Sequence, residues 1–340
     1  MFTSEAVLEE RLTTPSTALV ADLARQKGDL VILGAGGKMG PSLAVLARRA
    51  LDDAGRGGDS VFAVSRWSDA KTARALEERG VRAVAADLVE DADLSGLPDA
   101  AAVVFMVGAK FGTSSSPYLA WAVNAALPDR VARRYADAKI AAFSTGNVYP
   151  RVPAASGGSA ETDPVGPVGE YAMSCLGRER VFEHAAATLG TQVALIRLNY
   201  AVDMRYGVLA DVGQRIMGGS PVDLTTGVVN VVWQGYANEV ALRSLGHAST
   251  EPFILNVTGP ETLSVRRVAT DLAAGLDLDV VFEGAPAVDA LLSNASKCHH
   301  LFGYPDIPAA TLVAWQAEWL KSGLPLLGKP TKFDVRDGRF

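Results

Sequence analysis

Cysteine, histidine and long apolar runs are scarce in this sequence. Two cysteines, Cys175 and Cys298, are too few for a disulfide framework, which indicates a reducing compartment. The longest apolar run, residues 100–109, is far shorter than the about 20 residues that cross a bilayer. The 32 Lys and Arg against 38 Asp and Glu give a net charge of −6, which offers no basic surface for nucleic acid. We therefore expect a soluble cytoplasmic protein with no membrane or nucleic-acid partner.

Short apolar runs rich in β-branched residues alternate with amphipathic stretches over the first two hundred residues. Such near-continuous apolar strands, separated by helices, are typical of a parallel sheet covered on both faces. A sheet of this kind binds ligands beyond the carboxyl ends of its strands. The expected strands are residues 29–34, 60–65, 81–86, 101–107, 140–144 and 192–198.

A glycine-rich turn joins the first expected strand to a helix. The G-x-G-x-x-G pattern fails because its last position is Met39, but Gly34, Gly37 and Gly40 fit the spacing G-x-x-G-x-x-G. Glycines here let the backbone approach a diphosphate at the positive end of the helix, whereas the alternative is a tight turn without a ligand. The turn predicts a dinucleotide held by Gly34, Gly37, Lys38, Met39 and Gly40.

Residues after the second and third strands bear on the choice of dinucleotide. Ser65-Arg66 stands where NAD sites usually place a carboxylate for the ribose hydroxyls. An arginine there accepts a 2′-phosphate, which favours NADP over NAD, although a solvated surface arginine is the alternative. Asp87 and Leu88 close the third strand and are candidates to flank the adenine, while an Asp after a strand is also a common helix cap.

Changes in the alternating pattern predict the domain organisation. Residues 1–28 form a helical N-terminal extension that Pro15 splits into two helices. Residues 29–200 form the dinucleotide-binding domain, and residues 201–325 mainly form a substrate-binding domain, some of whose segments return to the first. Residues 326–340 are a polar tail of no evident role. The expected fold class is α/β: a Rossmann-like doubly wound parallel sheet with a smaller C-terminal α/β substrate domain.

Several motifs follow one another in a recognisable order: GAGGKMG (34–40), DL (87–88), FMVGA (105–109), STGNVY (144–149), EYAMSCLGRE (170–179), RLNYAV (197–202), NVVWQGYANEVA (230–241) and ILNVTGPETLS (254–264). With these motifs, residues 29–322 resemble the extended short-chain dehydrogenases/reductases, the NAD-dependent epimerase/dehydratase group. The resemblance implies an NAD(P) cofactor, a sugar-like substrate in the cleft, and a homodimer joined by the helices near 116–137 and 170–189.

The resemblance also implies hydride transfer at a hydroxyl or carbonyl, as in an oxidoreductase, epimerase or dehydratase. In that family a tyrosine phenol exchanges a proton with the substrate oxygen, and a Ser or Thr hydroxyl hydrogen-bonds the same oxygen. Tyr171 and Thr145 match these two positions, and Asn124 matches a helix asparagine of related enzymes, with a helix-surface amide as the alternative. The matching motifs imply further cofactor contacts at Val107, Gly108, Ala109, Tyr171 and Asn199.

One departure from the family pattern falls inside the expected active site. The lysine four residues after the tyrosine is Cys175 here, on the same helix face as Tyr171. Such a lysine lowers the tyrosine pKa, which is otherwise about 10. Three interpretations follow: another cation substitutes, Lys110 being better placed than Arg178; Tyr171 acts as a neutral acid; or the protein binds a dinucleotide without turnover, as a regulatory or sensor protein.

Two further groups are interpreted as structural. Cys298, His299 and His300 are adjacent in sequence, and the remaining histidines stand at no metal-ligand spacing from them, so we expect no metal site. Cys175 has no evident base beside it and is interpreted as a small buried hydrophobic residue rather than a nucleophile.

Overall fold

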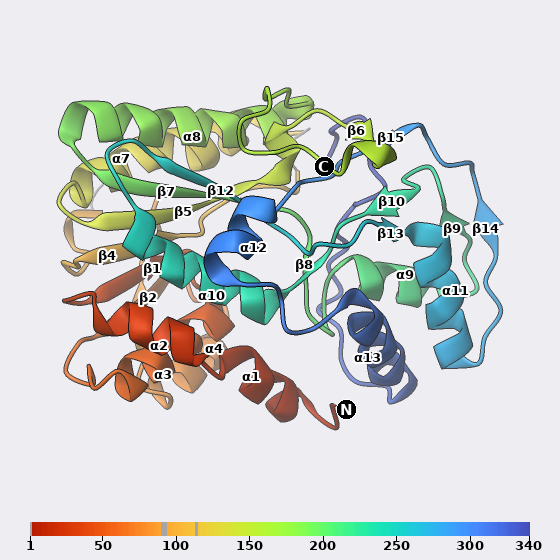
Figure 1. Ribbon diagram of the computed structural model, residues 1–340. Coiled ribbons are helices and arrows are strands. Elements are labelled where there is room, and N and C mark those ends of the chain that lie inside the picture. The colour runs from red at the N-terminus through yellow and green to blue at the C-terminus, as the bar shows by residue number, and fades with distance from the viewer. Residues whose placement is uncertain (1, 90–93, 113–114) are drawn as a thin grey trace.

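The computed structural model describes residues 2–89, 94–112 and 115–340 (Figure 1). Two short helices open the chain, α1 (Glu5–Thr13) and α2 (Thr17–Ala24), and the break between them falls at Pro15, as predicted. Serine side chains cap both helices, because Ser4 accepts from the Val7 N–H and Ser16 accepts from the Leu19 N–H. None of the described helices has both the length and the apolar character needed to span a membrane.

A seven-stranded parallel sheet forms the centre of the molecule, in the order β12-β7-β5-β4-β1-β2-β3. The strand order reverses between β1 and β4, which is where doubly wound sheets bind their ligands. All six predicted strands are present, and β12 returns to the sheet from the second half of the chain. The strands are β1 (Leu30–Leu33), β2 (Val61–Ser65), β3 (Arg82–Ala85), β4 (Ala102–Phe105), β5 (Lys139–Thr145), β7 (Gln192–Leu198) and β12 (Phe253–Val257).

Helices cover both faces of this sheet (Figure 1), so the predicted fold class is confirmed. One face packs against α2, α3 (Gly40–Asp53), α4 (Ala70–Glu77), α10 (Gln234–Ser244) and α12 (Ser296–Phe302). The other face packs mainly against α7 (Leu127–Arg134) and α8 (Gly169–Leu189). A short helix α6 (Pro117–Trp121) and a π-helical turn η1 (Ala122–Ala126) lead into α7 and also contact α8.

A second hydrophobic core lies beyond the carboxyl ends of the strands, around α9 (Val208–Met217), α11 (Val265–Leu276) and α13 (Ala309–Lys321). Leu8 and Leu12 of α1 belong to this core, whereas Leu19 and Leu23 of α2 belong to the sheet core. The N-terminal helices therefore join the two parts of the protein. Short strands and 3₁₀ turns complete it: η2 (Gly146–Val148), β6 (Val152–Pro153), η3 (Ala154–Ser156), β8 (Ala201–Val202), β9 (Val222–Asp223), β10 (Val228–Val229), β11 (Val232–Trp233), η4 (Leu245–His247), β13 (Leu263–Ser264), β14 (Phe282–Glu283) and β15 (Asp289–Ala290).

Candidate active site

The glycines of the β1–α3 turn serve different purposes. Gly34 has φ +86°, and a Cβ there would lie 2.9 Å from the Val107 nitrogen. A Cβ on Gly40 would collide with the backbone of Ala35. A Cβ on Gly37, by contrast, would meet only the Gly34 carbonyl oxygen at 3.4 Å. Packing within the protein therefore requires glycine at 34 and 40, whereas Gly37 leaves open space on the cavity side.

The helix that follows this turn presents an uncapped N-terminus to the cavity. Met39 is the N-cap residue of α3, and no side chain accepts a hydrogen bond from the first turn. The free N–H groups and the helix dipole make this end positive. A cavity of about 500 Å³ begins here and reaches Thr145 and Tyr171 on the other side. This is the geometry that a diphosphate requires.

Lys38 also lines the cavity, and its protonation state depends on its surroundings. Its Nζ lies 3.4 Å from the centroid of the Tyr206 ring, a cation–π contact. Burial, together with the nearby charges of Lys110 and Lys329, lowers the Lys38 pKa to about 7. An anion placed in the cavity would favour the charged form of this side chain.

Tyr171 and Thr145 meet in the cavity as predicted. Tyr171 is in the first turn of α8, and Thr145 ends β5. The Tyr171 phenol is near the Thr145 hydroxyl and the Cys175 thiol, and both groups affect its pKa. Burial raises the Tyr171 pKa well above its usual value and Cys175 raises it further, while Arg178 acts in the opposite direction. The phenol is therefore protonated at neutral pH.

The two cations near the phenol are arranged differently from the sequence expectation. Lys110 lies beside the ring, its Nζ 5.7 Å from the Tyr171 centroid, and donates to the Thr331 carbonyl at 2.9 Å. Burial lowers the Lys110 pKa to about 8. Arg178, expected to be less well placed, is the cation that lowers the Tyr171 pKa. Its effect is smaller than that of burial, so neither cation gives Tyr171 the low pKa of a ready base.

Asn124 has a structural position rather than one facing the cavity. It is fully buried in the π-helical turn η1. Its Nδ2 donates to the Ala109 carbonyl and the Ser174 hydroxyl, and its Oδ1 accepts from the Ala109 N–H and Arg178. These contacts use all the hydrogen-bonding groups of the amide and fix the loop after β4, and the surface-amide alternative is wrong because Asn124 is buried.

The other predicted cofactor residues divide into two groups. Gly108 lines the cavity after β4, and Asn199 lines it from the end of β7. Val107 and Ala109, the sequence neighbours of Gly108, are not among the lining residues. Asn199 is buried, and its Nδ2 has no hydrogen-bond partner in the part of the chain that the structure describes, so it is a donor that a ligand would satisfy.

The second group lies away from the cavity. Arg66 is exposed beyond β2 and is not among the cavity residues. Asp87 accepts from the Val89 N–H, and the Leu88 side chain packs in the core beside Val64. Hydrophobic burial holds the Leu88 side chain in the interior, and the expectation that the Asp87-Leu88 segment flanks an adenine stays a prediction.

Residues after position 326 are the part of the site that the sequence did not indicate. Lys329 and Thr331 line the large cavity, and the Phe340 ring meets the Tyr171 ring edge-on with centroids 5.4 Å apart. No motif marks this segment, because its position depends entirely on contacts with distant elements. Among the described residues, no group of three or more His, Cys, Asp or Glu side chains is arranged to hold a metal ion.

The chain belongs to the NAD dependent epimerase/dehydratase family, whose model matches residues 30–202. MoeE5 in complex with UDP-glucuronic acid and NAD is similar in fold, with a TM-score of 0.71, 18% identity and coverage of 87% of this chain and 100% of that one. UDP-glucuronic acid 4-epimerase from Bacillus cereus in complex with NAD has a TM-score of 0.72, 14% identity and coverage of 86% and 99%. UDP-glucose 4-epimerase from Thermus thermophilus in complex with NAD has a TM-score of 0.68, 20% identity and coverage of 85% and 98%. No curated protein matches the sequence.

Proposed function

We propose that this protein is a nicotinamide-dinucleotide-dependent enzyme that acts on a hydroxyl or carbonyl group of a sugar-like substrate. One observation carries the proposal: the uncapped N-terminus of α3 opens into the same cavity as the Tyr171–Thr145 pair. A site that binds a diphosphate at one end and holds a proton donor at the other suits a dinucleotide enzyme. The family membership supports the same reaction class.

The residues present fit such a cofactor. Gly37 leaves room for a diphosphate at the helix N-terminus, and Lys38 supplies a cation beside it. Gly108 and the orphaned Asn199 amide border the space between this turn and Tyr171. A nicotinamide ring bound there would supply hydride exchange with the substrate carbon.

Tyr171 acts as a general acid in this proposal. Because its pKa is raised, the phenol holds its proton at neutral pH and donates it to a carbonyl oxygen as that carbonyl is reduced. Thr145 hydrogen-bonds the same oxygen, and Arg178 stabilises the phenolate that the transfer leaves. The reverse direction, removal of a hydroxyl proton, is disfavoured without the family's lysine.

A second candidate function rests on the replacement of the family's lysine by Cys175. Without the lysine, a protein that binds the dinucleotide as a regulator or sensor needs no active base, and the raised Tyr171 pKa is compatible with that role. The two functions differ in whether Tyr171 affects turnover.

The choice between NAD and NADP depends on Arg66. The expectation of NADP gains no support from the similar solved structures, whose names give NAD. It stays a prediction: if Arg66 binds a 2′-phosphate, an Arg66→Gln variant loses NADP affinity and keeps NAD affinity in a fluorescence titration.

A homodimer is also proposed, with α6 and α8 in the interface. Large apolar side chains are exposed on these helices, with Tyr118 at 71% and Leu119 at 50% on α6 and Met173 at 37% on α8. Exposed apolar residues clustered on neighbouring helices are typical of an interaction surface. A Leu119→Glu variant tests the interface, because light scattering would then report a monomer.

The test of the proposed function is a titration with NAD and NADP, followed by absorbance assays of nicotinamide reduction and oxidation. We expect affinity for at least one dinucleotide and turnover that Tyr171→Phe reduces by about 100-fold or more, the usual size of general acid–base catalysis. Binding without Tyr171-dependent turnover across a sugar and sugar-acid panel would favour the sensor function. Failure to bind either dinucleotide would overturn both.

A further inference from the structure

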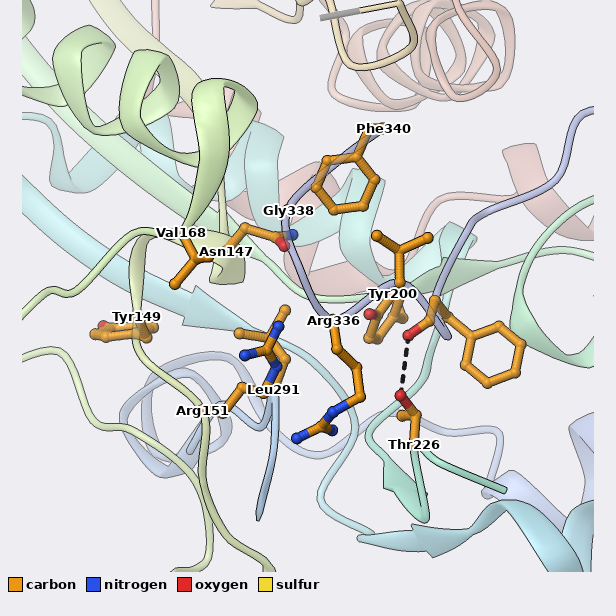
Figure 2. Close-up of a pocket in the computed structure, with 12 residues that line it drawn as sticks. Asn147, Tyr149, Arg151, Val168, Tyr200, Thr226, Leu291, Arg336, Gly338 and Phe340 are labelled. Carbon is orange, nitrogen blue, oxygen red and sulfur yellow. Dashed lines mark hydrogen bonds between the residues drawn. The ribbon is translucent and has the colours of Figure 1, made fainter. Parts of the chain in front are cut away.

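A small cavity adjoins the large one on the side away from the glycine turn. Its volume is about 40 Å³, and Asn147 and Tyr200 line both cavities. Figure 2 shows the side chains around it, which come from the segment after β5, from the second domain and from the C-terminal segment. The small cavity is therefore a side chamber of the candidate active site.

The C-terminal segment, residues 329–340, closes this chamber. The Thr331 N–H and hydroxyl both donate to Asp211 of α9, and Arg336 pairs with Asp289 at β15. Two glycines allow the segment to cross the start of α8, since Gly338 and Gly169 have positive φ values and a Cβ on either would strike the backbone beside the other. These contacts fix one wall of the chamber.

Arg151 is the residue of the chamber that points to a ligand. It is half-buried, and among the described residues it makes no hydrogen bond or ion pair, whereas Arg336 beside it is already paired with Asp289. Burial and the nearby Arg336 charge lower the Arg151 pKa, while Asp289 and Asp337 act in the opposite direction. A partly desolvated guanidinium without a partner is costly, and a bound anion offsets that cost.

The volume limits what this anion is. The chamber, at about 40 Å³, has less than a tenth of the volume of the large cavity, at about 500 Å³, so it admits only a small group. A carboxylate replaces one or two waters and forms two parallel hydrogen bonds with a guanidinium. A nucleoside diphosphate is many times larger than this chamber and does not enter it while residues 329–340 form the wall.

We propose that the substrate is a compact hydroxy or oxo acid, such as a free sugar acid, whose carboxylate binds Arg151 in the small chamber. The inference rests on the proposed function, since it places the reacting hydroxyl or carbonyl beside Tyr171 in the adjoining cavity. It also distinguishes this protein from the similar structures, whose names specify nucleotide sugars such as UDP-glucuronic acid.

The test measures binding by calorimetry to the full chain saturated with NAD or NADP, whichever binds. The probes are D-gluconate, D-glucuronate, glycerate, uncharged D-glucose and UDP-glucose. We expect at least one of the acids to bind about tenfold or more tightly than D-glucose and UDP-glucose, the usual effect of a charge-assisted hydrogen bond. Arg151→Gln should abolish this preference, and Arg151→Lys should restore part of it.

The matched control is Arg339→Gln, which removes one positive charge from an exposed side chain of the C-terminal segment, 81% accessible and not among the chamber residues. This control should leave acid binding unchanged. Binding of UDP-glucose as tight as that of the best acid, an unaltered affinity in Arg151→Gln, or no acid binding to the dinucleotide-loaded protein would each overturn the proposal. Because dinucleotide binding is measured first, those results are distinct from a failure of the proposed function.

Discussion

Cys175 lies one helical turn after Tyr171 on α8, with its thiol near the phenol. The thiol raises the Tyr171 pKa and is itself buried, with a pKa raised above its usual value chiefly by burial. Both groups are therefore protonated at neutral pH. Burial and this neighbouring thiol together favour the protonated phenol, which the proposed role of Tyr171 as a general acid requires.

Replacing Cys175 by lysine should change the preferred direction of proton transfer. A cation at this position lowers the pKa of a nearby phenol by about 1 to 3 units. The alkaline limb of the pH–rate profile should move to lower pH. The rate of alcohol oxidation should rise relative to the rate of carbonyl reduction. Cys175→Met is the control, because it fills the space without adding charge. Identical profiles for the two variants would contradict the assigned role of Tyr171.

Dinucleotide binding should be coupled to proton uptake at Lys38. Its pKa of about 7 means that the free protein holds this side chain largely neutral at about pH 8, and a diphosphate raises the pKa. Binding therefore takes up a proton, and affinity falls as the pH rises above about 7. Calorimetry in buffers of different ionisation enthalpy measures the uptake.

Lys38→Met should reduce this uptake and weaken binding, whereas Lys321→Met should change neither, since Lys321 is exposed and pairs with Asp277 in the second domain. Equal uptake in the wild type and Lys38→Met would show that Lys38 is not the titrating group.

Two glycine substitutions should separate stability from binding. Gly37→Val meets only one ordinary contact, so we expect the free energy of unfolding to change by about 1 kcal/mol or less, with dinucleotide affinity reduced at least tenfold. Gly40→Val drives its side chain into the Ala35 backbone and should destabilise the fold by more than about 3 kcal/mol. Urea unfolding and fluorescence titration provide the measurements. Normal dinucleotide affinity in Gly37→Val would place the diphosphate elsewhere.

A buried ion pair beneath the site should be sensitive to loss of one partner. Glu179 is fully buried, pairs with Arg197 at 2.7 Å and accepts from the Ser144 hydroxyl. Glu179→Gln leaves Arg197 without its countercharge, and we expect a loss of about 3 to 5 kcal/mol in the free energy of unfolding. Glu183→Gln on the same helix breaks an exposed pair with Arg180 and should cost less than about 1 kcal/mol. Similar losses in the two variants would show that the buried charge is not the cause.

Local sequence patterns predicted the strands of the sheet, the glycine turn and the position of Tyr171. Each strand of the first domain is a compact apolar run, and the glycine turn and Tyr171 belong to short contiguous motifs, so neighbouring residues suffice to identify them. Asn124 shows the limit of this reasoning. Its position in a helix was evident, but only its partners on Ala109, Ser174 and Arg178 show that the amide is fully used within the protein.

By itself the sequence determined that this is a doubly wound α/β protein with a glycine-rich turn after the first strand, and that Cys175 stands four residues after Tyr171. Adjacent residues or a regular period are enough to show each of these features. Only the tertiary structure decided that Arg178 acts on the phenol, that Arg151 has no partner among the described residues and that residues 329–340 close the chamber. Those features depend on burial and on contacts between segments far apart in the chain, which no local pattern records.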